Sequence, residues 1–143
     1  MSTWKQAQAE ELVFWACQNY DIPACYARKY KFFAEFIEAL PKEVDVLDVG
    51  CGAIAYSVCL GKPHWRLTLV DSLIKEYSAL PPGKTNLKSL QLGDSLIWDP
   101  TFLASDGLTY DLVLFLNVLD HVEDMTEMFK NVSSHVRNHM LLS

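Results

Sequence analysis

Short apolar segments alternate with helix-length intervals from Val44 onward, and this alternation limits the possible folds more than any other feature of the chain. The segments with the length and composition of strands are Val44 to Val49, Arg66 to Val70, Leu87 to Leu92, Asp111 to Leu116 and His139 to Leu142. Strands that alternate with helices over short connections form a parallel sheet covered on both faces. Right-handed crossovers then favour the strand order 3-2-1-4-5.

The chain before Pro41 has a helical pattern instead. One helix is expected from Thr3 to about Asn19 and a second from about Ala24 to Leu40. The 143 residues are therefore expected to form one globular unit. It comprises an N-terminal helical cap of two helices over residues 1–41 and an α/β domain with a Rossmann-like parallel sheet over residues 42–143.

Three more helices are expected among the strands. The first two span about Ala53 to Leu60 and about Leu73 to Leu80. The third follows a capping box made by Asp120 and Glu123 and continues to about Val136.

The predicted strand order reverses direction between the first and fourth strands. Ligands bind above the carboxyl ends of parallel strands at such a switch point. The segments that begin at Asp48 and at Asn117 are therefore the place to look for function.

The first strand ends in a turn that contains Gly50 and Gly52. Glycines allow positive φ and let a ligand approach the backbone closely, and free amides of the following helix point into the same space. Asp71 ends the second strand, nineteen residues after Gly52. A carboxylate there can accept hydrogen bonds from both hydroxyls of a ribose. The turn and the acid together predict a nucleoside ligand.

Two nucleoside ligands fit this turn. The string Gly50 to Ala55 matches the G-x-G-x-x-G/A pattern of dinucleotide sites, which would indicate an NAD-dependent oxidoreductase. Asp48 argues against that alternative, because it lies beside the place of a pyrophosphate and would repel it. A ligand with a cationic amino group would be attracted instead. S-adenosylmethionine carries such a group and no phosphate, so it is the favoured ligand.

These residues resemble a known family. Val46-Leu47-Asp48-Val49-Gly50-Cys51-Gly52 is similar to the first motif of class I S-adenosylmethionine-dependent methyltransferases. Leu69-Val70-Asp71 and Leu92-Gly93-Asp94 resemble the second and third motifs. Tyr110 to Val122 resembles the fourth strand and following loop of the small-molecule subgroup. The resemblance extends from about Val44 to Ser143.

The resemblance implies that the cofactor-binding residues lie at strand ends and in the turns that follow them. They are Asp48, Gly50, Cys51, Gly52, Asp71, Ser72, Asp94, Ser95, Asn117 and Val118. The glycine turn with Asp48 would hold the methionine end and Asp71 the ribose. Asp94 with Ser95 would contact the adenine. The backbone at Asn117 and Val118 would line the sulfonium pocket.

The methyl acceptor is expected to be a small molecule. No Asp/Asn-Pro-Pro-Tyr string follows the fourth strand, and the net charge of −6 argues against binding nucleic acid through its phosphates. A protonated acceptor would need a general base, and His121 is the candidate catalytic residue because it follows the fourth strand and histidine titrates in the useful range. No metal site is expected.

Two departures from the family affect these expectations. Ile54 replaces the third glycine of the common turn, and the antiparallel strand pair that ends the family's sheet is absent. An open edge on the fifth strand favours an alternative, a truncated non-catalytic S-adenosylmethionine-binding module completed by a homodimer or a partner chain. No apolar run suits a membrane span or a signal peptide, so cytoplasmic localisation without membrane association is expected.

Overall fold

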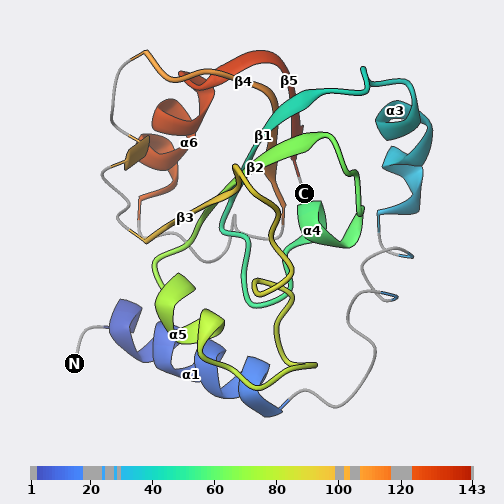
Figure 1. Ribbon diagram of the computed structural model, residues 1–143. Coiled ribbons are helices and arrows are strands. Elements are labelled where there is room, and N and C mark those ends of the chain that lie inside the picture. The colour runs from blue at the N-terminus through green and yellow to red at the C-terminus, as the bar shows by residue number, and fades with distance from the viewer. Residues whose placement is uncertain are drawn as a thin grey trace.

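A parallel sheet forms the centre of the molecule. The computed structural model describes residues 3–17, 24, 28, 30–98, 102–103, 107–116 and 124–142. The sheet in these residues has five strands in the order β3-β2-β1-β4-β5, and each neighbouring pair is parallel (Figure 1). The strands are β1 (Val44–Val49), β2 (Trp65–Val70), β3 (Ser95–Ile97), β4 (Tyr110–Phe115) and β5 (Val136–Leu142). This confirms the predicted Rossmann-like α/β fold and its strand order.

Helices lie on both sides of the sheet (Figure 1). On one side is α6 (Met125–Ser133), and on the other are α3 (Ala34–Glu38), which follows the 3₁₀ turn η1 (Lys31–Phe33), and α4 (Tyr56–Cys59). The remaining described helices, α1 (Thr3–Cys17) and α5 (Ile74–Ser78), lie beyond the carboxyl end of β2. The N-terminal helix therefore reaches the edge of the sheet at which ligands of this fold bind.

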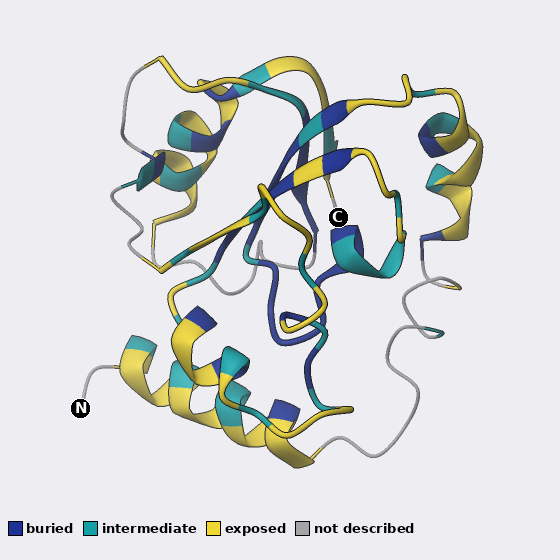
Figure 2. Cartoon of the chain, in the orientation of Figure 1, coloured by how far each residue is buried: buried dark blue, intermediate teal, exposed yellow. Residues whose placement is uncertain are grey.

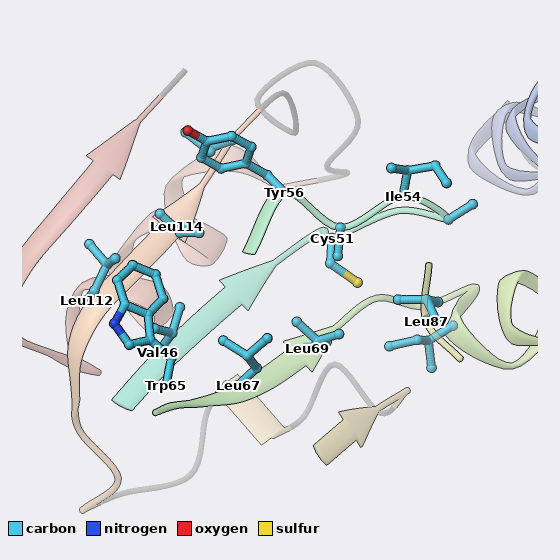
Figure 3. Packing of buried hydrophobic residues seen from close by; sticks show 14 of the residues in the cluster. Val46, Cys51, Ile54, Tyr56, Trp65, Leu67, Leu69, Leu87, Leu112 and Leu114 are labelled. Carbon is cyan, nitrogen blue, oxygen red and sulfur yellow. The ribbon is translucent and has the colours of Figure 1, made fainter. Parts of the chain in front are cut away.

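Two apolar clusters hold these layers together, one on each face of the sheet. Alternate residues of a strand point to opposite faces, so Val46 packs in the cluster that contains Trp65 and Leu112 (Figure 3). Its neighbour Leu47 packs in the other cluster, with Val132 of α6. Figure 2 shows the result: the central strands β1, β2 and β4 are mostly buried, whereas the edge strands β3 and β5 are exposed or half-buried.

The third strand is not where the sequence placed it. Leu87 to Leu92 was expected to form it, but β3 begins only at Ser95. The side chain of Asn86 donates to the carbonyl oxygen of Ala55 and accepts from its amide, at 2.9 and 2.8 Å. These bonds hold the start of the segment against the loop before α4, away from β2. Leu92, at the end of the segment, is fully exposed.

Helix α1 begins at Thr3, as predicted, but other predicted helices begin and end at other residues. The described end of the helix predicted from Ala24 to Leu40 consists of η1 and the short α3. The helix expected over Ala53 to Leu60 covers only Tyr56–Cys59, because the preceding residues pair with Asn86. In α6 the capping residue is Asp124, whose carboxylate accepts from the amide of Glu127 at 2.9 Å. The capping box predicted at Asp120 and Glu123 lies outside the described residues.

A network of ion pairs crosses the amino end of the sheet, and we call it the amino-edge cluster. Arg66 pairs with Asp45 at 2.7 Å. Arg137 pairs with Asp111 at 2.7 Å and with Asp45 at 3.6 Å. Asp111 also accepts from the Asp45 amide, and this bond is the main reason that the Asp111 pKa is lowered. A cavity of about 480 Å³ opens beside the cluster, lined by Glu43, Val44, Asp45, His64, Arg66 and Asp111. Each carboxylate of the cluster has a cationic partner.

Candidate functional site

The glycine turn predicted at the end of β1 is present. Gly50 and Gly52 have φ values of 67° and 68°, in the left-handed region where a side chain is strained. The Gly50 amide donates to the carbonyl oxygen of Val70 at 2.7 Å, which fixes the turn to the end of β2. The turn therefore lies at the carboxyl ends of β1 and β2, beside the switch point between β1 and β4.

Asp48, at the end of β1, is a buried carboxylate beneath this turn. It is 3% exposed, and its Oδ2 accepts hydrogen bonds from the amide of Ser57, at 3.3 Å, and from the Ser57 hydroxyl. Burial raises the pKa of Asp48 to about 6, although the Ser57 bonds act in the opposite direction. Among the described residues, no cation pairs with this carboxylate. The site therefore favours a positively charged group near the turn.

Asp71 follows β2 directly and faces the same turn. Its Oδ2 accepts from the Gly52 amide at 3.0 Å and its Oδ1 from the Leu73 amide at 2.9 Å. Burial again raises the pKa to about 6, and the carboxylates of Glu11 and Glu76 add to the effect. A carboxylate oxygen with one backbone bond still has acceptor capacity, so Asp71 can receive ligand hydroxyls.

The thiol of Cys51 is buried in the turn, within electrostatic range of both acids. Burial and the carboxylates of Asp48 and Asp71 raise its pKa well above the ordinary value. The thiol is therefore neutral and is suited to packing, not to nucleophilic chemistry.

Helix α1 covers one side of this turn. The Trp15 indole is buried against Gly52, where a Cβ would meet its ring atoms at 3.5 to 3.9 Å. One turn from the start of the helix, Gln8 donates to the hydroxyl of Ser72 at 2.7 Å. The expected cofactor site is thus bounded by the sheet and by the N-terminal helix.

The geometry is that of a nucleoside-binding turn, and the sequence comparison identifies the family. The profile of a family described as "Methyltransferase domain" matches residues 19–143. The chain belongs to this methyltransferase domain family.

Relatives of this methyltransferase domain include ubiquinone biosynthesis O-methyltransferases. That of Rickettsia conorii is 30% identical over 96 residues, which cover 66% of this chain and 32% of the relative. That of Rickettsia akari is 29% identical over 108 residues, which cover 75% of this chain and 41% of the relative. The chain thus spans less than half the length of these relatives.

Solved methyltransferases share the fold of this domain. The N-methyltransferase NodS from Bradyrhizobium japonicum WM9, in complex with S-adenosyl-L-homocysteine, has a TM-score of 0.68 at 20% identity over 99% of this chain and 72% of its own. Magnesium protoporphyrin IX methyltransferase from Synechocystis PCC 6803, with bound S-adenosylmethionine, has a TM-score of 0.59 at 20% identity over 84% of this chain and 57% of its own.

The structure brings together most, but not all, of the predicted cofactor residues that it describes. Asp48, the glycine turn, Asp71 and Ser72 share the carboxyl edge. Asp94 and Ser95 do not join them, because they stand at the amino end of β3. The Asp94 carboxylate instead accepts from the amides of Leu67 and Gln91, at 2.9 and 2.8 Å. The expectation that Asp94 follows the third strand is wrong.

Three predicted residues lie outside the described part of the chain. They are Asn117, Val118 and His121, so their roles stay predictions. Within the described residues, no group of His, Cys, Asp or Glu side chains could hold a metal ion, and no helix there is both long and apolar enough to cross a membrane.

The sequence predicted an N-terminal helical cap but did not identify which side chains of α1 reach the glycine turn. Gln8, Glu11 and Trp15 recur at the spacing of one helix face, which was a usable signal. Their position at the glycine turn depends on how α1 docks, and no local pattern specifies that. Trp98 was also missed. It follows β3 at the carboxyl edge, and Lys75 lies 4.0 Å from the centre of its ring.

Proposed function

We propose that this domain binds S-adenosylmethionine at the glycine turn and transfers its methyl group to a small molecule. The observation that carries the proposal is the pair of buried acids, Asp48 and Asp71, beside a turn whose glycines have positive φ. Neither acid has a cationic partner among the described residues. A cationic, phosphate-free nucleoside complements such a turn, whereas the pyrophosphate of NAD would be repelled. The bound S-adenosylmethionine or S-adenosylhomocysteine in solved proteins of the same fold supports this choice.

The cofactor would be held by few direct contacts. The ribose hydroxyls would donate to Asp71, and the methionine amino group would lie near the negative charge of Asp48. Because Gly50 and Gly52 have no side chains, the part of the ligand that connects the ribose to the amino group could lie close to their backbone. Bound S-adenosylmethionine supplies the electrophilic methyl group. The protein's own contribution is orientation and exclusion of water, which can account for roughly 7–11 kcal/mol of a barrier.

A small-molecule acceptor with an ionisable hydroxyl is the first class to test. The relatives are named as O-methyltransferases of ubiquinone biosynthesis, and the net charge of −6 disfavours nucleic acid. A hydroxyl acceptor would need a base, and His121 is the proposed one. His121→Ala should leave cofactor affinity intact and reduce turnover. Unchanged turnover with a hydroxyl acceptor would exclude the base role.

Calorimetric titration of the 143-residue chain tests the cofactor. S-adenosylmethionine and S-adenosylhomocysteine should bind, and NAD should not. Binding of NAD alone would replace this proposal with the oxidoreductase alternative. A methyl-transfer assay over phenols, amines and thiols then identifies the acceptor class.

A second candidate is a non-catalytic module that binds S-adenosylmethionine and needs a second copy or a partner chain. The observation in its favour is the position of β5 at the outer edge of the described sheet, since an unpaired strand edge is a template for another strand. Mass measurement alongside the transfer assay separates the two candidates. A monomer that transfers methyl groups would remove the second.

We also propose a domain boundary and a cellular location for this protein. The division near Pro41 into an N-terminal cap and a Rossmann-like domain can be tested by limited proteolysis. A cytoplasmic location is consistent with the free thiols of Cys17, Cys51 and Cys59, and cell fractionation would test it.

A further inference from the structure

An exposed aromatic side chain, that of Trp98, stands at the carboxyl end of β3. Its indole is 53% exposed, whereas those of Trp15 and Trp65 are buried in the core. Trp98 directly follows Ile97, the last residue of β3, and so lies at the edge of the sheet at which ligands of this fold bind. Its position, more than its exposure, therefore points to a ligand.

Trp98 lies beside Asp71, across the ends of two paired strands. The parallel register of β2 and β3 pairs Val70 with Ile97, and the Asp71 amide donates to the Ile97 carbonyl oxygen at 3.1 Å. The next residues along the two strands, Asp71 and Trp98, are therefore neighbours. Val70 and Ile97 both pack in the cluster on the α6 side of the sheet, so the alternation of side chains directs Asp71 and Trp98 to the opposite side.

A contact with α5 fixes the position of the indole. The Lys75 ammonium lies 4.0 Å from the centre of the Trp98 ring, which is a cation–π contact. Lys75 is the second residue of α5, the helix that begins just after Asp71. Because the indole is half exposed in spite of this contact, it is both held by the protein and accessible to a ligand.

The residue that was expected to contact the base cannot do so in this arrangement. Asp94 stands at the amino end of β3, and its two carboxylate oxygens accept from the backbone amides of Leu67 and Gln91 there. The carboxyl end of the same strand instead offers an aromatic ring next to the acid that would bind the ribose. In a nucleoside the base is attached directly to the sugar, so a ribose at Asp71 brings its base to the neighbouring residue.

We propose that the base of the bound cofactor stacks on the indole of Trp98, and that this stacking takes the place of the expected contact with Asp94. Every base has a π-face, and base–aromatic stacking is a strong contact in proteins that bind nucleotides. Lys75 keeps the indole beside Asp71. This inference rests on the proposed function, and it adds a residue from the end of β3 to a site otherwise built around β1 and β2.

Calorimetry with S-adenosylhomocysteine on the 143-residue chain tests the stacking contact. Trp98→Ala should weaken binding about ten- to a hundredfold, which is the effect of losing one base–aromatic stack. Trp98→Tyr should recover most of the affinity, because it keeps an aromatic face. The matched control is Phe129→Ala, since Phe129 is a comparably exposed aromatic residue, 43% exposed, on α6. It should bind as the parent does.

A ligand without a base separates stacking from a merely structural role. S-ribosylhomocysteine keeps the sugar and the amino acid, so it should bind the parent and Trp98→Ala equally. Asp94→Asn should bind S-adenosylhomocysteine as the parent does. The inference would be overturned if Trp98→Ala bound S-adenosylhomocysteine like the parent or lost both ligands to the same extent. A loss in Asp94→Asn as large as that in Trp98→Ala, at an unchanged melting temperature, would also overturn it. Failure of the parent to bind S-adenosylhomocysteine would overturn the proposed function and the inference together.

Discussion

The aspartates at the two ends of the sheet have opposite electrostatic environments. At the amino end, Asp45 and Asp111 share Arg137, and the pKa of Asp111 is lowered. At the carboxyl end, Asp48 and Asp71 have no cationic partner among the described residues, and the pKa of each is raised to about 6. Asp45 and Asp48 lie on the same strand, so secondary structure is not the cause. The contrast is the one that the proposed cofactor role predicts, because a carboxylate without a protein cation can be neutralised by a cationic ligand.

The largest expected effect follows from changing Asp71 at the carboxyl end. Asp71→Asn should weaken S-adenosylhomocysteine binding about 100-fold, since charge-assisted bonds to ribose hydroxyls contribute about 1.5–3 kcal/mol each. Asp111→Asn is the matched control at the amino end and should bind normally. Calorimetry measures both. Equal losses in the two variants would mean that the contrast between the edges has no bearing on binding.

The second prediction concerns stability. Asp48→Asn keeps an oxygen for the Ser57 bonds and removes a buried charge, so it should stabilise the unliganded fold at pH 7.5 by about 2 kcal/mol. The Asp48 pKa is higher in the folded state than its ordinary value of 3.8, so its protonation favours folding. That contribution is lost as pH rises through about 6. The gain from Asn should therefore shrink toward pH 4.

Denaturant titrations at pH 4.5 and 7.5 test this prediction. Asp45→Asn serves as the control and should be mildly destabilising at pH 7.5, because it removes the partner of Arg66. If Asp48→Asn were destabilising at pH 7.5, favourable interactions in the folded protein would have to outweigh the cost of burying the Asp48 charge.

A smaller effect is expected in the pH dependence of binding. Ionised Asp48 and Asp71 attract the cationic amino group, so S-adenosylhomocysteine affinity should rise about tenfold from pH 5 to pH 7.5. 5′-Methylthioadenosine lacks the amino group and should show a weaker dependence. A flat profile for both ligands would indicate that these acids are already ionised at pH 5.

The smallest effect belongs to the exposed pairs of the amino-edge cluster. Arg137→Ala should lower the free energy of unfolding by less than about 1 kcal/mol, because Arg137 is 45% exposed and solvent screens its pairs. The loss should decrease further at high salt. A loss of several kcal/mol would mean that the ion pairs of the amino-edge cluster contribute much more to folding than solvent-screened pairs usually do.

The sequence predicted the sheet well because periodicity and turn chemistry are local. The apolar runs of β1, β2 and β4, and the glycine turn between β1 and α4, follow directly from residue type. Where the sequence was wrong, a distant partner decided the outcome. Asn86 pairs with Ala55, far away in the chain, and this moves the third strand and shortens α4. For the same reason, Asp94 was assigned to the wrong end of a strand, and the contacts of the predicted N-terminal cap with the glycine turn were not identified.

The contact between Trp15 and Gly52 gives the molecule a built-in optical reporter. A buried indole emits at shorter wavelength than an exposed one, and this indole packs against a turn whose backbone the cofactor would approach. Rearrangement of α1 when the site fills should therefore change the fluorescence of this tryptophan without any added label. Comparison with a Trp15→Phe variant would separate the emission of Trp15 from that of Trp4, Trp65 and Trp98. The Trp15 signal would then follow the occupancy of the site in real time.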